Sequence, residues 1–169
     1  MTDKTALVTG GTGAIGQEMC RALHEAGYRV VANCYPGDEE NARSWIADCE
    51  KDGIKIHLEA FDVADCESAQ QGVQRAEEAV GPIDVLVNAA GITRDAPLVK
   101  MEPDSWSSVL RTNLDSAYNV TRPVVAGMVQ RGFGRVVNIS SVNGQQGQFG
   151  QANYSAAKAG LHGFTMAVA

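Results

Sequence analysis

A tyrosine and a lysine near the carboxyl end of the sequence have the spacing of a proton-transfer pair. Tyr154 and Lys158 stand four residues apart, which places both side chains on one face of a predicted helix. An ammonium beside a phenol stabilises the phenolate, so the tyrosine can exchange a proton with a carbonyl oxygen. Ser141 precedes Tyr154 by thirteen residues, after an apolar run, and can hydrogen-bond the same oxygen. Alone, the pair is typical of a helix surface, but with this serine and a glycine-rich turn near the amino end it indicates carbonyl reduction.

That glycine-rich turn follows the first apolar run and leads into an amphipathic stretch. It reads Thr9-Gly10-Gly11-Thr12-Gly13-Ala14-Ile15-Gly16. Glycines at such a turn let the backbone approach a pyrophosphate, whose charge then lies at the helix N-terminus. The string fits GxGxxG through its last three glycines, and it fits TGxxxGxG if Ala14 replaces the middle glycine. An ordinary strand-to-helix turn is the alternative, and we favour a dinucleotide site.

The residues after the second predicted strand leave the choice of dinucleotide open. The strand ends at Asn33-Cys34-Tyr35, and Asp38-Glu39-Glu40 and then Arg43 follow. Carboxylates near the adenosine ribose repel a 2′-phosphate and an arginine attracts one, so the charges lean slightly towards NAD(H) over NADP(H). The alternative is that these carboxylates only occupy the first turn of the next helix, where the helix dipole favours them.

Short β-rich runs alternate with longer helical stretches, which is the pattern of βαβ units around a parallel sheet. The predicted strands are 5–9, 29–33, 54–61, 83–88 and 135–140, and the predicted helices are 15–26, 39–51, 65–80 and 103–131, the last broken at Pro123. Glycines at positions 27, 53, 81 and 132 follow the four helices, where a left-handed residue is needed. Residues 143–150 are expected to form a loop. The sequence therefore predicts a single α/β domain, a doubly wound Rossmann-type parallel sheet with helices on both faces.

Composition narrows the function classes. The 169 residues are 44% hydrophobic and 20% charged, and 14 basic against 20 acidic residues give a net charge of −6. No basic cluster is longer than a pair, which disfavours nucleic-acid binding. No apolar run has the length of a membrane span or a secretory signal, so no membrane partner is expected. The four widely spaced cysteines favour a reducing cytoplasm over a disulfide framework or a metal site.

Six motifs in order resemble the short-chain dehydrogenase/reductase family over essentially the whole chain. They are TGGTGAIG from Thr9, Asp62-Val63, NAAG from Asn88, Asn113 within TNL, NISS from Asn138 and YSAAK from Tyr154. The resemblance implies an oxidoreductase with NADP(H) or NAD(H) as cofactor. It implies a catalytic set of Asn113, Ser141, Tyr154 and Lys158. In that set Tyr154 is the acid/base, Ser141 binds the carbonyl oxygen, Lys158 also holds the nicotinamide ribose, and Asn113 anchors a water of the proton relay.

The same resemblance implies the residues that bind the cofactor. They are Gly10, Gly11, Thr12, Gly13, Ile15, Gly16, Asp62, Val63, Asn88, Ala89, Gly91, Tyr154 and Lys158. Asp62 is expected to contact the adenine, and Asn88 and Gly91 to line the cofactor groove. The usual NNAG of the family is NAAG here, so Ala89 lacks a side-chain amide that the family has at this position.

A closer resemblance, to the acetoacetyl-CoA reductases of polyhydroxyalkanoate synthesis, lies in GITRD from Gly91, in Lys100-Met101 and in the run from Arg131 to Ala167. It implies reduction of acetoacetyl-CoA to 3-hydroxybutyryl-CoA. The implied substrate residues are Asp95, Lys100, Ser141, Gln148, Phe149, Gln151 and Tyr154. Amides can hold carbonyls, Phe149 can pack on a methyl group and Lys100 can meet a CoA phosphate. A solvated turn is the alternative for the glutamine-rich loop.

Two other hypotheses stay open. A 3-oxoacyl-acyl-carrier-protein reductase of fatty-acid synthesis shares the catalytic residues. A non-catalytic nucleotide-binding fragment is the second, because the chain stops inside an apolar helix at Ala169 without a cap, whereas the family continues with further strands and a substrate-covering helix. We therefore expect residues 1–169 to be a C-terminally truncated dinucleotide-binding reductase domain. In a complete chain we expect a homotetramer acting on a small-molecule CoA thioester.

Overall fold

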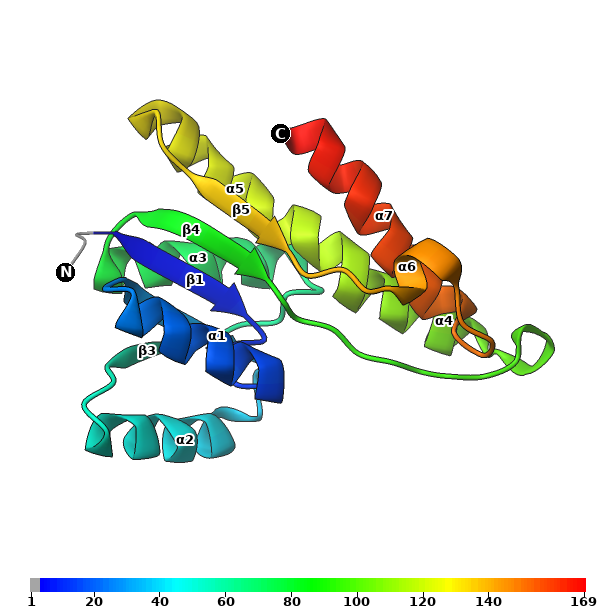
Figure 1. Cartoon of the computed structure of the whole chain (residues 1–169), viewed down its shortest axis with the longest axis horizontal. Helices are drawn as coiled ribbons and strands as arrows, with labels where there is room; N and C mark the ends of the chain where they lie inside the picture. Colours follow the sequence, from blue (N-terminus) through cyan, green and yellow to red (C-terminus); the bar gives the residue numbers. More distant parts are fainter. Residues whose placement is uncertain (1–3) are drawn as a thin grey trace.

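The fold is built on a sheet of five parallel strands (Figure 1). The structure is a computed structural model and describes residues 4–169. The strands are β1 (Thr5–Thr9), β2 (Arg29–Cys34), β3 (Ile56–Ala60), β4 (Ile83–Asn88) and β5 (Arg135–Asn138). Their order across the sheet is β3-β2-β1-β4-β5. From β1 the chain adds β2 and β3 on one side and then β4 and β5 on the other, so the strand order reverses between β1 and β4. At such a reversal the loops after the two strands diverge and leave a crevice at the carboxyl ends.

Helices cover both faces of the sheet. α1 (Ala14–Glu25) and α2 (Glu39–Lys51) lie against one face, and α3 (Cys66–Val80) and α5 (Ser116–Arg131) lie against the other (Figure 1). Leu7 of β1 packs towards α3 and α5, whereas its neighbours Ala6 and Val8 pack towards α1 and α2, because successive side chains of a strand point to opposite faces. Strands buried on both faces explain the continuous apolar runs of the sequence. The predicted doubly wound α/β fold is confirmed.

Some strands and helices begin or end at other residues than predicted, because local hydrogen bonds and strand register set their ends. β3 begins at Ile56 rather than at residue 54, because the Ile54 N–H donates to a carbonyl at the end of α2 (2.9 Å). β5 ends at Asn138, opposite the last residue of β4, and the register explains why the predicted strand 135–140 is shorter. α3 begins after Asp65, whose side chain accepts the Ser68 N–H as a helix cap. The four glycines predicted to end helices all have positive φ, from 67° to 109°.

The long helix predicted over 103–131 is in fact interrupted, and not at Pro123. α4 (Pro103–Leu110) leads into a π-helical segment, Arg111–Asp115, and then into α5, which contains Pro123 without ending there. Inside the π-helical segment, the Asn113 side-chain Nδ2 donates to the Val109 carbonyl (2.9 Å), which a regular helix would offer to a backbone N–H. A side chain inserted into the backbone ladder widens the turn, and this explains the position of the break.

The segment predicted as a loop over 143–150 begins with a helical turn. α6 (Asn143–Gln146) packs on α7 (Ala152–Val168), and a methyl group on Gly144 would lie 2.7 Å from the Lys158 carbonyl carbon. This close approach of two backbones requires glycine and fixes the turn. Of the predicted loop, only residues 147–150 are without helix, with left-handed φ angles of 72° at Gly147 and 81° at Gly150.

No helix within residues 4–169 has the length and apolar character needed to cross a bilayer. The same residues contain no group of three or more histidine, cysteine, aspartate or glutamate side chains placed to hold a metal ion.

Candidate active site

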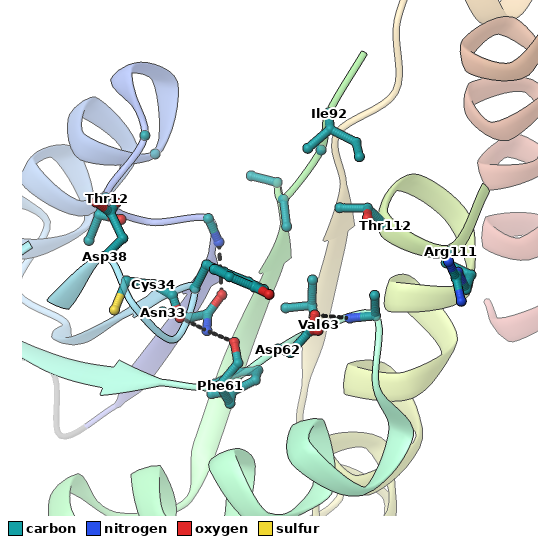
Figure 2. Close-up of a pocket in the computed structure, with 18 of the residues that line it drawn as sticks. Thr12, Asn33, Cys34, Asp38, Phe61, Asp62, Val63, Ile92, Arg111 and Thr112 are labelled. Atoms are coloured by element: carbon teal, nitrogen blue, oxygen red, sulfur yellow. Dashed lines mark hydrogen bonds between the residues drawn. The ribbon is translucent and has the colours of Figure 1, made fainter. Parts of the chain in front are cut away.

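A pocket of about 1130 Å³ lies at the carboxyl ends of β1 and β4, where the strand order reverses. Its walls are the glycine-rich turn, the end of β2, the loop after β3, residues 89–92 after β4, and one side of α4 and the π-helical segment. Figure 2 shows Thr12 and Asp38 at one side of this pocket and Arg111 at the other. The pocket therefore occupies the place where open α/β sheets bind ligands.

Three of the four glycines of the turn, Gly10, Gly11 and Gly16, have no room for side chains. A methyl group on Gly10, whose φ is 62°, would lie 2.9 Å from the Ala90 Cα, and one on Gly11 would lie 2.9 Å from the Ala32 Cα. A methyl group on Gly16 would collide with the Gly10 carbonyl oxygen. No acidic residue stands in the first turn of α1, and its N-cap, Gly13, has no side chain to accept the backbone N–H groups. The helix start is thus open to an anionic group.

Asn33 holds this turn against the rest of the pocket. Its side-chain Oδ1 accepts the Gly10 N–H (3.1 Å), and its Nδ2 donates to the Phe61 carbonyl (2.9 Å; Figure 2). The buried amide therefore joins the loops after β1 and β3 through β2. Sequence reasoning noted Asn33 only as a strand end. The available signal was a polar residue inside an apolar strand, because such a residue needs buried partners.

The predicted adenine residue, Asp62, lies in the pocket wall in a fixed conformation. Its Oδ1 accepts the Ala64 N–H (2.8 Å), and its own N–H donates to the Ser68 hydroxyl (3.0 Å). Val63 is buried beside it, and its carbonyl accepts a hydrogen bond from Asn119 of α5. Backbone and side-chain bonds thus hold this loop in place without any ligand.

The predicted cofactor residues divide into two groups by position. Those that line the pocket are Gly10, Thr12, Gly13, Ile15, Gly16, Asp62, Val63, Ala89 and Gly91. Gly11 and Asn88 lie behind the wall, and Tyr154 and Lys158 lie outside the pocket. Asn88 is 7% exposed and donates to Thr121 and Asn138, so it joins β4 to α5 and β5. After it, the Thr9 hydroxyl of β1 accepts the N–H groups of Ala89 and Ala90.

Lys158 and Asn113 meet at Gly91, beside the pocket. A methyl group on Gly91 would lie 2.5 Å from the Asn113 Oδ1 and 3.7 Å from the Lys158 Nζ. The Lys158 side chain is 4% exposed, its Nζ donates to the Ile139 carbonyl (2.7 Å), and burial lowers its pKa. The Asn113 Nδ2 donates to the Ile92 carbonyl, while its buried Oδ1 has no partner among the described residues. An unpartnered buried oxygen beside a buried amine is a place for a water or a ligand hydroxyl.

Tyr154 lies on α7, and Ser141 follows the end of β5, which is hydrogen-bonded to α7. The Lys158 Nζ lies 5.7 Å from the centre of the Tyr154 ring, as the spacing on α7 predicts. The Ser140 hydroxyl donates to the Lys158 carbonyl (2.7 Å), which ties the end of β5 to α7. The Ser141 hydroxyl accepts the Asn143 N–H (3.2 Å), so its own hydrogen remains available to a ligand oxygen.

A chain of hydrogen bonds joins two of the predicted substrate residues. The Gln151 Nε2 donates to the Asp95 carboxylate (2.8 Å), and its Oε1 accepts from Asn143 Nδ2 (2.8 Å). Gln148 and Phe149 are exposed in the loop before α7, with Phe149 86% exposed. Lys100 is exposed at the end of a separate 3₁₀ turn, Leu98–Lys100. The structure therefore brings Asp95 and Gln151 together and leaves Lys100 apart, on its own exposed turn.

Several pocket residues were not predicted. Arg94, Ser108, Arg111 and Thr112 line the wall opposite the glycine-rich turn. Arg111 and Thr112 immediately precede Asn113, and the π-helical segment turns them towards the pocket. The TNL motif marks Asn113 in this segment, but only the widened turn shows that Arg111 and Thr112 beside it face the pocket.

One family model and several known proteins match nearly the whole chain. Acetoacetyl-CoA reductase of Allochromatium vinosum is 54% identical over 98% of this chain and 68% of its own length. Acetoacetyl-CoA reductase of Cupriavidus necator is 50% identical over 100% of this chain and 68% of its own length. 3-Oxoacyl-[acyl-carrier-protein] reductase of Chlamydia muridarum is 41% identical over 99% of this chain and 67% of its own length. Residues 4–169 match the family described as short chain dehydrogenase, and the chain belongs to that family.

Proposed function

We propose that the protein reduces a 3-oxoacyl thioester with NAD(P)H, converting acetoacetyl-CoA to 3-hydroxybutyryl-CoA. The observation that carries the proposal is the buried Lys158, which shares α7 with Tyr154 and meets Asn113 at the Gly91 end of the nucleotide pocket. The two relatives at 50% and 54% identity carry the name acetoacetyl-CoA reductase, which supports the same substrate.

The residues of the pocket fit a dinucleotide. The glycine-rich turn has the close backbone approaches and the open helix start that a pyrophosphate needs, with Thr12 and Ile15 beside it. Asp62 and Val63 would hold the adenine, and Ala89 and Gly91 would lie along the middle of the molecule. The nicotinamide cofactor, when bound, supplies the hydride that the carbonyl carbon receives.

The side chains near Gly91 would then donate the proton that the substrate oxygen receives. In the proposed reaction the Ser141 hydroxyl donates a hydrogen bond to the substrate oxygen, and the Tyr154 hydroxyl gives it a proton. The carbon gains a hydride, the oxygen gains a proton, and the ketone becomes a secondary alcohol. Lys158 holds the nicotinamide ribose and stabilises the tyrosinate that remains. The unpartnered Asn113 Oδ1 would hold the water that returns a proton towards Tyr154.

The proposed substrate site lies beside these side chains, in the loop before α7. Gln148 and Phe149 are exposed there, and we place the short acyl group against them. Gln151 and Asp95 would border the same group, and Lys100 would meet a phosphate of CoA at the rim. An acyl-carrier-protein thioester is the second candidate substrate, favoured by the relative at 41% identity. Comparing turnover of matched CoA and carrier-protein thioesters separates the two.

We further propose one dinucleotide-binding domain over residues 1–169, a cytoplasmic location and a homotetramer of the protein. Three of its four cysteines are buried free thiols, as expected of a protein from a reducing compartment. Exposed apolar side chains on α5, β5 and α7, among them Val129, Val137 and Met166, support association with further copies.

Replacing Tyr154 with phenylalanine tests the mechanism. We expect Tyr154→Phe to lose about 10³-fold or more of its reduction of acetoacetyl-CoA, because the proton donor is absent. Nucleotide binding should persist, because Tyr154 does not line the pocket. The measurement is oxidation of NADH and NADPH by absorbance, with nucleotide affinity by calorimetry.

Tyr118→Phe on the exposed side of α5 is the matched control, and it should retain full turnover. Unchanged turnover in Tyr154→Phe contradicts the proposed mechanism. Nucleotide binding by the unaltered protein without turnover of either thioester supports a non-catalytic nucleotide-binding module instead.

A further inference from the structure

Asn153 is a buried amide directly before the proposed proton donor, Tyr154. It is the second residue of α7, and it is 0% exposed. It does not line the nucleotide pocket, and it belongs to none of the groups of site residues described above. A fully buried polar side chain needs hydrogen-bond partners, so the partners of this amide indicate what it does.

The two N–H hydrogens of the amide tie the start of α7 to the elements that follow β4. The Asn153 Nδ2 donates to the Arg94 carbonyl (3.0 Å), in the loop after β4, and to the Ser105 carbonyl (3.0 Å), in the first turn of α4. α4 packs against α7 near its start (Figure 1). One side chain therefore joins the start of α7 to two main-chain segments that are 59 and 48 residues away in the sequence.

The oxygen of the same amide holds the main chain at Tyr154. A regular helix would pair the Tyr154 N–H with the Gly150 carbonyl, but Gly150 has a left-handed φ of 81° and its carbonyl accepts the Ala96 N–H (2.9 Å). The Asn153 Oδ1 accepts the Tyr154 N–H instead (2.8 Å). The first turn of α7 thus has an acceptor that the helix itself does not supply. All three hydrogen bonds of the amide go to main-chain groups.

The groups that must meet the Tyr154 hydroxyl are held from another side of α7. The Lys158 Nζ donates to the Ile139 carbonyl (2.7 Å), and the Ser140 hydroxyl donates to the Lys158 carbonyl (2.7 Å), so this part of α7 is fixed to the end of β5. Ser141 follows directly in the chain. The position of the phenol relative to Ser141 and Lys158 therefore depends on a separate anchor at the start of α7, and Asn153 supplies it.

We propose that Asn153 is a positioning residue, which holds the Tyr154 hydroxyl at the distance from the Ser141 hydroxyl and the Lys158 ammonium that proton transfer requires. This inference rests on the proposed function, in which Tyr154 donates the proton. Asn153 acts through the main chain at Tyr154 and not through the substrate. A displacement of about 1 Å in a catalytic group costs about a hundredfold in rate, so even a small shift of this turn matters.

The test compares reduction of acetoacetyl-CoA by the unaltered protein and by Asn153→Leu, which keeps a similar volume and removes all three hydrogen bonds. We expect kcat to fall about a hundredfold, and the KM for acetoacetyl-CoA and the nucleotide affinity to stay within about threefold. Asn153→Ala is the second variant, because water can enter the vacated space and satisfy the freed groups, which keeps the protein folded. Its kcat should still fall at least about tenfold, because a water does not anchor the backbone.

An isotope measurement separates positioning from a simple loss of folded protein. A variant that only unfolds more readily has fewer active molecules, and those that stay folded react as before. In Asn153→Leu and Asn153→Ala the proton transfer itself should be slower, so the ratio of kcat in water to kcat in heavy water should increase. Val73→Ala, which truncates a core side chain of α3, is the matched control. It should lose stability and keep kcat and the isotope ratio.

The outcomes distinguish this inference from the proposed function. Unchanged kcat in both Asn153 variants overturns the positioning role and leaves the reductase proposal standing. A lower kcat with an unchanged isotope ratio also overturns the positioning role, because Asn153 would then only stabilise the fold. A rise in KM without a loss of kcat overturns it in favour of a role in substrate binding. No turnover by the unaltered protein overturns the proposed function and this inference together.

Discussion

Gly16 and Gly163 are both helical glycines, but only one of them needs to be glycine. A methyl group on Gly16 would collide with the Gly10 carbonyl and lie 2.7 Å from the Gly11 Cα, whereas one on Gly163 would meet nothing within 4 Å. Gly16→Ala should therefore displace the turn, lower the free energy of unfolding by about 1–3 kcal/mol and weaken nucleotide binding at least about tenfold. Gly163→Ala should be neutral or stabilise by up to about 1 kcal/mol.

Urea unfolding and nucleotide titration of both variants check this prediction. Equal effects of the two substitutions would show that helix propensity, and not the close backbone approach at the turn, decides the result.

The residues found from the sequence are those whose spacing carries information. Tyr154 and Lys158 share a helical face because they stand four apart, and the glycines of the turn follow from the need for close backbone approach. Asn33 and Arg111 were missed because their importance depends on which loops meet in space. Asn33 joins two loops through hydrogen bonds to Gly10 and Phe61, and neither partner is near it in the sequence.

At the scale of elements, the interruption between α4 and α5 shows what a sequence pattern omits. The apolar periodicity of 103–131 predicts a helix, and proline is the usual site of a break. The actual break depends on the Asn113 amide, which bonds the Val109 and Ile92 carbonyls. Because Ile92 follows β4 and Val109 belongs to α4, only the tertiary fold supplies both partners. The widened turn then places Asn113 beside Gly91 and Lys158.

The Gln151 side chain helps to hold the loop before α7, which leads to a prediction about substrate binding. It joins Asp95 to Asn143, whereas another bond from outside the loop is the Ala96 N–H to the Gly150 carbonyl, so loss of the side chain would loosen the loop that carries Phe149. Gln151→Leu should raise the KM for acetoacetyl-CoA about tenfold and leave the affinity for NADH unchanged, because Gln151 does not line the nucleotide pocket. Steady-state kinetics and calorimetry measure the two quantities.

Gln145→Leu, an exposed side chain on α6, serves as the control and should change neither value. If NADH affinity fell in Gln151→Leu as much as the KM rose, the side chain would support the whole site and not the substrate loop alone.

At the scale of the whole molecule, the buried Lys158 links stability to pH. Burial lowers its pKa from the ordinary value of 10.5, so the folded state binds this proton less readily than the unfolded chain. Below the lowered pKa the cost of burying the ammonium is fully present. Between the lowered pKa and 10.5 the unfolded chain binds more protons than the folded state, so the free energy of unfolding rises with pH. Above 10.5 the lysine is neutral in both states, and the cost of burying the ammonium has gone.

Lys158→Met has no titrating group at this position, so the stability of the wild type relative to this variant should rise as the pH approaches 10.5. Urea midpoints at a series of alkaline pH values measure the difference, and Lys55→Met on the surface is the control. A constant difference between wild type and Lys158→Met across the range would contradict the effect of burial.

The topology as a whole could be predicted because alternation of β-rich and helical runs allows few arrangements. The exact ends could not, since they depend on the register with the neighbouring strand: Ala60 of β3 pairs with Cys34, the last residue of β2, and Asn138 of β5 pairs with Asn88, the last residue of β4. The position of the pocket followed from the sheet order, which the sequence implies only through the family resemblance. The position of Asp38 in the pocket wall required the structure, because the sequence alone could also place this residue only at the start of a helix.

The segment between Gly147 and Gly150 has a consequence for how such a protein diversifies. Its ends have left-handed φ angles of 72° and 81°, and Phe149, one of the two residues between them, is 86% exposed. Replacing an exposed side chain there costs the folded state little, so selection acts on that position mainly through the molecule that is bound. Ser141 and Lys158 are held by separate hydrogen bonds, Ser141 by the Asn143 N–H of α6 and Lys158 through the Ile139 carbonyl that follows β5. For the substrate site proposed above, mutation of this position can therefore change which acyl group is bound while Ser141 and Lys158 keep their places.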